Sequence, residues 1–140
     1  MSTTNSLKKQ FILDTLVPYF EDPQTRGYNK DTKLCSYLTK DGKKCAVGKH
    51  MKEGPWQKYN WGLVSLLNTK TLEEILTDEA FAIGLTVEEW ESVQNVHDNI
   101  KTNSSIFSKK DYRDRLLSFI TGLERATGEN FEELRLININ

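Results

Sequence analysis

The chain is poor in the residues and segments that mark disulfide scaffolds, repetitive chains and membrane proteins. Its 140 residues include two cysteines, three prolines and eight glycines, which excludes a disulfide scaffold and a low-complexity chain. The apolar runs are a few residues long, whereas a membrane-spanning helix needs about 20 apolar residues in a row. The first ten residues hold no long apolar segment, so we expect no secretory signal. These absences predict a cytoplasmic protein without a membrane partner.

Composition favours one globular domain over residues 1–140. Apolar residues make up 37% of the chain and charged residues 28%, a balance typical of a folded protein with a polar surface. We find no linker and no internal repeat that would divide the sequence. The net charge is −1, which argues against a protein that binds nucleic acid through bulk positive charge.

The charges are nevertheless distributed unevenly along the chain. Residues 26–58 contain nine basic and three acidic residues, whereas residues 71–98 contain eight acidic residues and neither lysine nor arginine. Two interpretations stay open at this point. The two regions are solvated surfaces that attract each other weakly within one fold, or one of them attracts a charged partner. The sequence does not indicate which of the two regions such a partner would bind.

Capping patterns predict the starts of several helices. Ser6 can cap a first helix, which should end or kink at Pro18 because proline removes a backbone donor inside a helix. Capping-box patterns at residues 71–74 (TLEE) and 86–89 (TVEE), and a weaker one at 108–111 (SKKD), predict three further helices. Two of these helices carry apolar faces, formed by Trp90, Val93, His97 and Ile100 and by Tyr112, Leu116, Phe119, Ile120 and Leu123.

Two segments are predicted to form β-structure. Asp41 and Gly42 lie between short mixed runs, in the pattern of a hairpin turn. Residues 134–140 alternate and contain β-branched side chains, which is compatible with a C-terminal strand. The predicted fold class is therefore α+β and mainly α, with four to five helices packed round a short β-hairpin.

The two cysteines and two histidines allow three interpretations. Cys35 and Cys45 are ordinary buried thiols in the first, because regular hairpin geometry disfavours a disulfide between them. In this interpretation the protein holds no cofactor. A structural zinc ion is the second, with the Cys₂His₂ set of Cys35, Cys45, His50 and His97 as its ligands.

The third interpretation is a thiol enzyme. Cys45 would be the nucleophile, because a helix start beside lysines lowers the pKa of a thiol. His97 would be its base and Gln94 an orienting or oxyanion group one turn earlier on the same face. The alternative for His97 is a core histidine beneath the apolar residues of its own helix. We expect a protein without enzymatic activity in preference to this enzyme.

An aromatic and basic stretch is the candidate binding surface. Aromatic anchors dominate protein interfaces, and lysines steer association, although the same residue types also stack bases and contact phosphates. The candidate anchors are Trp56, Tyr59 and Trp61, and the candidate steering charges are Lys43, Lys44, Lys49 and Lys52. Partners of two classes remain open, namely a protein and a nucleic acid or nucleotide. A plainer alternative is that the tryptophans pack in the core beneath solvated lysines.

Three short motifs resemble those of small uncharacterised proteins encoded by bacteriophages and prophages. They are Cys35-Ser-Tyr37, the run at 41–48 (DGKKCAVG) and Gln94-x-x-His97-Asp98. The resemblance is to a C-x-Y…G-x-x-C-A-x-G knuckle after a first helix, followed by a helical Q-x-x-H-D. It covers roughly residues 7–100, and the sequence departs from the pattern directly after the knuckle.

The resemblance implies a phage origin and no particular reaction. Small phage accessory proteins often act stoichiometrically on host machinery, defence systems included. We therefore hypothesise a non-enzymatic protein that binds and modulates or inhibits a host protein in the cytoplasm of an infected bacterium. The alternatives are a Cys/His-site protein and a nucleic-acid or nucleotide binder that uses the basic hairpin. The sequence leaves the oligomeric state open.

Overall fold

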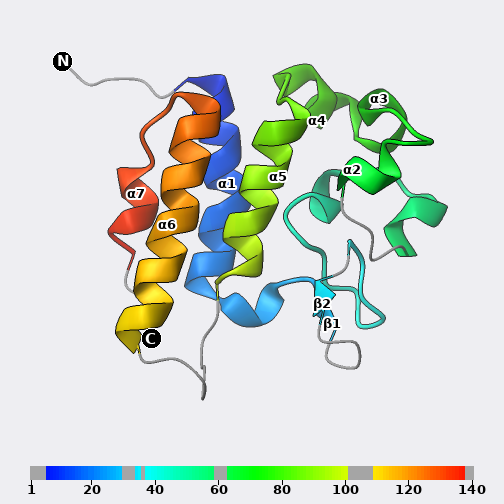
Figure 1. Ribbon diagram of the computed structural model, residues 1–140. Helices are drawn as coiled ribbons and strands as arrows, with labels where there is room; N and C mark the ends of the chain where they lie inside the picture. Colours follow the sequence, from blue (N-terminus) through cyan, green and yellow to red (C-terminus); the bar gives the residue numbers. More distant parts are fainter. Residues whose placement is uncertain (1–5, 30–33, 36, 59–62, 101–108, 138–140) are drawn as a thin grey trace.

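Three helices that lie side by side form the body of the molecule (Figure 1). The structure, a computed structural model, describes residues 6–29, 34–35, 37–58, 63–100 and 109–137. We call the three long helices the helical layer; they are α1 (Leu7–Glu21), α5 (Val87–Asp98) and α6 (Lys109–Thr127). Shorter helical segments complete the described fold: η1 (Pro23–Thr25), η2 (Gly48–His50), η3 (Pro55–Lys58), α2 (Leu63–Leu66), α3 (Leu72–Ile75), α4 (Asp78–Ile83) and α7 (Glu132–Arg135).

The first helix begins where its cap predicts but extends past its proline. The Ser6 hydroxyl accepts a hydrogen bond from the Lys9 backbone N–H at 3.0 Å, which satisfies a donor at the start of α1. The helix then continues through Pro18 to Glu21, so of the two expected outcomes, an end or a kink at this proline, the end is wrong. Tyr19 and Phe20, beyond the proline, are each 3% exposed, and their burial favours the last turn against the lost backbone hydrogen bond.

The helix starts in the middle of the chain are confirmed. Thr71 with Glu74 and Thr86 with Glu89 form complete capping boxes at the starts of α3 and α5. The apolar faces are largely confirmed, because Trp90, Val93, His97, Ile100, Leu116, Ile120 and Leu123 are buried, whereas Phe119 is only half-buried. The third capping pattern at 108–111 and the side chain of Tyr112 lie outside the described residues.

The prediction of an α+β fold is wrong, because the described chain is mainly helical. Pairing between extended segments is limited to two residues on each side, β1 (Tyr28–Asn29) with β2 (Leu34–Cys35). At Asp41–Gly42, where a hairpin was expected, a single bridge between Leu38 and Lys44 closes a turn without a ladder. Two residues of regular pairing leave the other backbone groups of this segment to be satisfied by local turns and by helix side chains such as Gln94 and Tyr19.

The predicted C-terminal strand is likewise wrong over the residues that can be compared. Residues 132–135 form α7, and Leu134 packs into the core at 1% exposed. Residues 138–140 lie outside the described chain. The alternation at 134–137 fits a single buried leucine on a short helix as well as it fits a strand, because four residues are too few to separate the two periods. Among the described helices, none combines the length and apolar character needed to cross a bilayer.

Two glycines of α6 provide a matched test of the helix. A Cβ added at Gly122, inside the helix, or at Gly128, directly after it, would meet no atom within 4 Å. Gly128 has a φ of +71°, whereas Gly122 lies in the helix interior. We expect Gly122→Ala to raise the free energy of unfolding by about 0.5–1 kcal/mol and Gly128→Ala to lower it by about 1 kcal/mol. Urea denaturation measures both, and equal effects of the two variants would contradict the described end of α6.

Candidate functional site

Residues 37–51, which contain the motif DGKKCAVG, form a compact segment that we call the knuckle. It lies beside the ends of α1 and α5, near β1 and β2 (Figure 1). Its first half is a tight turn in which the Thr39 N–H donates to the Lys43 carbonyl at 2.8 Å, and the Thr39 hydroxyl donates to the Asp41 carboxylate. Gly42 adopts a φ of +83°, which glycine tolerates without steric cost. The turn is therefore closed by local hydrogen bonds and not by a β-ladder.

The second half of the knuckle is a helical turn packed against its own first half. The Lys49 N–H donates to the Cys45 carbonyl at 3.0 Å, and the Gly48 N–H donates to the Cys45 sulfur at 3.2 Å. A Cβ on Gly48 would lie 2.1 Å from the Tyr37 carbonyl oxygen, which is closer than any real contact. Cys45, Ala46 and Val47 are each at most 1% exposed. Packing therefore requires glycine at position 48, and residues 45–47 belong to the core.

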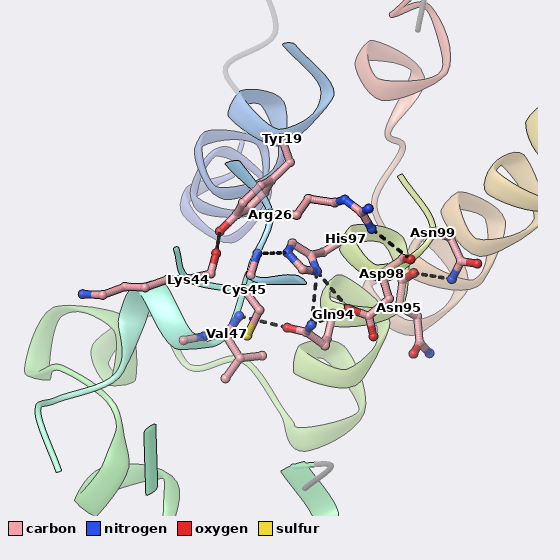
Figure 2. Close-up of polar contacts among 12 residues, drawn as sticks. Tyr19, Arg26, Lys44, Cys45, Val47, Gln94, Asn95, His97, Asp98 and Asn99 are labelled. Carbon is pink, nitrogen blue, oxygen red and sulfur yellow. Dashed lines mark hydrogen bonds and ion pairs between the residues drawn. The ribbon is translucent and has the colours of Figure 1, made fainter. Parts of the chain in front are cut away.

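Gln94 joins the knuckle to helix α5 (Figure 2). Its side-chain Oε1 accepts a hydrogen bond from the Val47 backbone N–H at 3.1 Å. Because that oxygen must face a backbone donor, the amide nitrogen faces the other way, and it donates to Asp98 Oδ1 at 2.6 Å. A backbone donor in an irregular segment is in this way satisfied by a helix side chain.

His97 joins a second irregular segment to the same helix. Its Nε2 accepts a hydrogen bond from the Gly27 backbone N–H at 3.3 Å, so the neutral ring carries its proton on Nδ1. That Nδ1–H donates to Asp98 Oδ1 at 2.8 Å. The ring is fully buried, and the Tyr19 ring meets it edge to face at 4.6 Å and 87°. Burial lowers the pKa of His97 despite the neighbouring carboxylate, so the imidazole is neutral.

His50, on the knuckle, makes the reciprocal contact with helix α1. The Thr15 hydroxyl donates its single proton to the Phe11 carbonyl at 2.9 Å, so it can only accept from His50 Nε2, which lies 2.8 Å away. The imidazole packs against the rings of Phe11 and Trp90, with centroids 4.5 and 5.9 Å away. Burial, followed by the charge of Lys49, lowers the pKa of His50 to about 4.

Two further contacts attach the knuckle to α1. The Tyr19 hydroxyl donates to the Lys44 carbonyl at 2.6 Å (Figure 2). The Lys49 ammonium donates to the Thr15 carbonyl at 2.9 Å and lies 4.4 Å from the centroid of the Tyr19 ring. Burial lowers the pKa of this lysine. Lys49, predicted to steer a partner, is therefore turned inward and helps to fix the knuckle.

The geometry does not form the nucleophile and base that the thiol-enzyme interpretation needs. Burial raises the pKa of the Cys45 thiol to about 12, far from the activated range of a nucleophilic cysteine. Its sulfur accepts from Gly48, while the accepting nitrogen of His97 is occupied by Gly27. In Figure 2 the Cys45 side chain extends toward Val47, and no dashed line joins it to His97. The alternative of a buried core histidine describes His97 better.

The zinc interpretation stays a prediction. The side chain of Cys35 lies outside the described residues. Within the described part of the chain, no group of three or more His, Cys, Asp or Glu side chains is arranged to hold a metal ion. The structure shows that the hydrogen-bonding nitrogen of His50 faces Thr15 on α1, whereas that of His97 faces Gly27 in the segment before β1.

The predicted aromatic and basic surface is only partly described. Trp56 is half-buried against the core, and its indole N–H donates to the Lys52 carbonyl at 2.9 Å. The Lys52 ammonium lies 3.5 Å from Asp78, and that of Lys43 lies 3.6 Å from Asp41. Lys44 is exposed. The other two predicted anchors, Tyr59 and Trp61, lie outside the described residues.

Exposed acidic residues form a surface on the short helices α3 and α4 and on the first turn of α5. Figure 1 shows α3, α4 and the first turn of α5 gathered at one end of the molecule. We call this region the acidic surface; its exposed residues are Glu73, Glu74, Asp78, Glu79 and Glu88. Phe81, on α4, is 43% exposed and is one of few large apolar side chains that the described surface presents. The sequence indicated the charge of this region but not that α4 also exposes an aromatic side chain.

Sequence reasoning missed the partners of the motif residues. Thr15 fell within the predicted first helix, and Tyr19 and Gly27 were assigned no role. Nothing in their spacing relates them to the knuckle, because each contact joins residues at least 25 positions apart. A scan of protein-family models and searches of curated proteins and solved structures gave no significant match to this chain.

The close approach of Gly48 to the Tyr37 carbonyl gives a direct prediction. Gly48→Ala places a methyl group on a backbone oxygen that cannot move without opening the knuckle. We expect the free energy of unfolding to fall by about 2–3 kcal/mol or more, measured by urea denaturation. The control is Gly122→Ala, the same substitution at an open position. A Gly48→Ala protein as stable as wild type would contradict the packing of the knuckle.

The link through Gln94 gives a second prediction. In Gln94→Glu the new carboxylate still accepts from Val47 but faces the Asp98 carboxylate, so we expect a loss of about 1–3 kcal/mol at neutral pH. Adding Asp98→Asn supplies an amide donor to the carboxylate at position 94 and keeps an acceptor for His97. The double variant should therefore recover part of the loss, which thermal or urea unfolding of the four proteins in the cycle measures. Purely additive effects would mean that the two side chains do not interact.

Proposed function

We propose that this chain is a non-catalytic accessory protein of bacteriophage type, which binds a host protein in the bacterial cytoplasm and modulates or inhibits it. A component of a defence system is one such host protein. The proposal rests on one observation, which is that the motif residues form hydrogen bonds within the fold. Gln94, His97 and Cys45, the residues best suited to chemistry, are committed to hydrogen bonds within the fold. Recognition by the outer surface is then the function that the geometry favours.

The charge pattern favours the acidic surface as the binding face. Lys49 and Lys52, two of the predicted steering charges, are engaged with Thr15 and Asp78. On the acidic surface, by contrast, the side chain of Asp78 is 97% exposed even in its contact with Lys52. Phe81 adds an apolar side chain to this face. Interfaces of this kind combine an apolar contact with charges that speed association.

The partner expected from this surface is a host protein with a positively charged patch. Charge complementarity raises the association rate and makes binding sensitive to salt, because exposed charges are screened beyond about 8–10 Å at physiological ionic strength. The predicted basic face, with Trp56, Lys43 and Lys44, remains the second candidate for the same function, and Tyr59 and Trp61 would belong to it. A nucleic-acid or nucleotide partner would also use that basic face.

The two faces are distinguished by matched charge reversals in the full-length protein. Glu79→Lys/Glu88→Lys alters the acidic surface, and Lys40→Glu/Lys44→Glu alters an equal number of exposed residues on the basic side. Each protein is immobilised, incubated with bacterial lysate at low and high salt, and the bound proteins are quantified by mass spectrometry. The captured protein is then purified, and its affinity for each variant is measured.

We expect the acidic-surface variant to bind the captured protein at least about tenfold more weakly and the basic-side variant to bind as wild type does. Phe81→Ala should weaken binding as well, without the change in salt dependence. The reverse ranking would assign the basic face instead. A gel shift with single- or double-stranded DNA or RNA that disappears at high salt, and that the basic-side variant abolishes, would replace the protein partner with a nucleic acid.

A further inference from the structure

Helix α4 presents apolar residues to solvent instead of burying them. Phe81, which is 43% exposed, and the following Ala82 both face outward, and Ile83 is only half-buried. Ala80 is the buried residue of this helix. A surface helix usually turns its apolar residues toward the core, whereas a run of exposed apolar residues is typical of an interaction surface. We call residues 81–84 (FAIG) the α4 face.

Acidic side chains flank the α4 face. Asp78 and Glu79 lie about one turn before its residues on the same helix, and Glu88 follows in the first turn of α5. All three are exposed, the side chain of Asp78 to 97%. Within the described part of the chain, one ion pair offsets this charge, from Lys52 to Asp78 at 3.5 Å. A partner for the α4 face must therefore combine positive charge with apolar contact.

The knuckle carries a surface of the opposite sign. Its tip, residues 40–44, contains three lysines and is here called the lysine turn. Lys40 and Lys44 are exposed, and Lys43 is half-buried. A Cβ added at Gly42 would meet no atom within 4 Å, so the tip of the turn is open to solvent. The long alkyl stems of the lysines add apolar surface to this positive charge.

Hydrogen bonds fix the backbone of the lysine turn within the fold. The Gly42 N–H donates to the Thr39 carbonyl at 3.0 Å, and the Lys43 N–H donates to the Thr39 hydroxyl at 3.0 Å. The Tyr19 hydroxyl of α1 donates to the Lys44 carbonyl at 2.6 Å. A turn that is already ordered loses little conformational entropy on binding, which favours association even through a small surface.

The two surfaces complement each other but lie apart in one molecule. In Figure 1 the knuckle lies near β1 and β2, toward the end of α5, whereas α4 lies at the start of that helix. Among the ion pairs of the described residues, none joins the lysine turn to the acidic surface. The turn can therefore meet an α4 face on another copy of the chain. The net charge of −1 opposes such an encounter only weakly.

We infer that the protein associates with itself, the lysine turn of one copy docking on the α4 face of a second copy. The lysine stems cover Phe81, and the ammonium groups pair with the carboxylates of Asp78 and Glu79. A two-fold pair makes this contact twice, so the expected species is a dimer. Because few residues take part on each side, the association is weak and reversible.

Self-association goes beyond the proposed function and is measured without any host protein. A host protein that binds the acidic surface competes with it, because the same carboxylates cannot pair with both partners. Dimers then keep the binding face covered until dilution or a tighter partner releases it. Failure to capture a host protein would leave the self-association in place, and the converse also holds, so the two ideas fail separately.

Sedimentation velocity of the full-length protein tests the inference, over about 10 µM to 1 mM protein at low salt and at about 0.5 M NaCl. We expect the sedimentation coefficient to rise with protein concentration at low salt and the association to be at least about tenfold weaker at high salt. Glu79→Lys/Glu88→Lys and Lys40→Glu/Lys44→Glu should each associate at least about tenfold more weakly than wild type. Their equimolar mixture should form dimers again, because each altered surface meets one of opposite charge on the other variant.

A matched control separates local charge from net charge. Asp14→Lys/Glu132→Lys changes the net charge as much as Glu79→Lys/Glu88→Lys does, at exposed positions of α1 and α7. It leaves the lysine turn and the α4 face intact, so we expect it to associate as wild type does. Loss of association in this control equal to that in the acidic-surface variant would mean that net charge alone is responsible, which would overturn the inference.

Three further outcomes would overturn it: a sedimentation coefficient independent of concentration at low salt, wild-type association in either charge-reversed variant, or a mixture no more associated than its components. If a variant does not fold, the wild-type protein provides the second measurement. Copies labelled with ¹⁴N and ¹⁵N are mixed and cross-linked with a carbodiimide, which joins lysines directly to carboxylates. Links between copies should join residues 40–44 to residues 73–88, and links between copies at other places alone would refute the proposed contact.

Discussion

The backbone N–H groups of Gly27 and Val47 lie in irregular segments, and each donates to a side chain of α5. These two hydrogen bonds hold both irregular segments against the helix. A buried backbone donor without a partner costs about 1–3 kcal/mol, so a segment with little regular pairing must find acceptors elsewhere. His97 and Gln94 supply them from one helix face, and Asp98 fixes the orientation of both. The helix therefore acts as a template on which the knuckle is built.

This arrangement explains why the residues whose types suggest a catalytic site serve to hold the fold together instead. A cysteine, a histidine, a glutamine and an aspartate within one cluster are typical of a catalytic site. Here burial raises the pKa of the thiol and lowers that of the imidazole, which is the opposite of what activation requires. The same residues instead make an irregular segment rigid. The outer surface, with its separated charges, is left as the part of the molecule suited to recognising a partner.

The elements that sequence alone predicts well are those that depend on local interactions. The capping boxes at Thr71 and Thr86 and the buried face of α5 follow from hydroxyl and carboxylate spacing and from the helical period. Pro18 was misleading because burial of Tyr19 and Phe20 outweighs the lost hydrogen bond. The hairpin at Asp41–Gly42 was misleading because a glycine turn indicates a reversal of the chain but not the ladder that should follow it.

The site was predictable only in part for the same reason. His97 could be placed on a buried helix face, since its spacing with Trp90 and Ile100 is local. Its tautomer and its partner could not, because Gly27 is 70 residues away in the sequence. The inward orientation of Lys49 depends on the carbonyl of Thr15 and the ring of Tyr19, which the fold brings together. Such contacts have no signature in a single sequence.

The contact of Gly48 with the Tyr37 carbonyl limits which substitutions the chain tolerates. Because the neighbouring Val47 N–H donates to Gln94, a side chain at position 48 that displaces the backbone would also disturb the contact of the knuckle with α5. Residues on the outer faces are under no such restraint and are free to diverge. A substitution on those faces alters the surface that a partner would meet and leaves the knuckle intact.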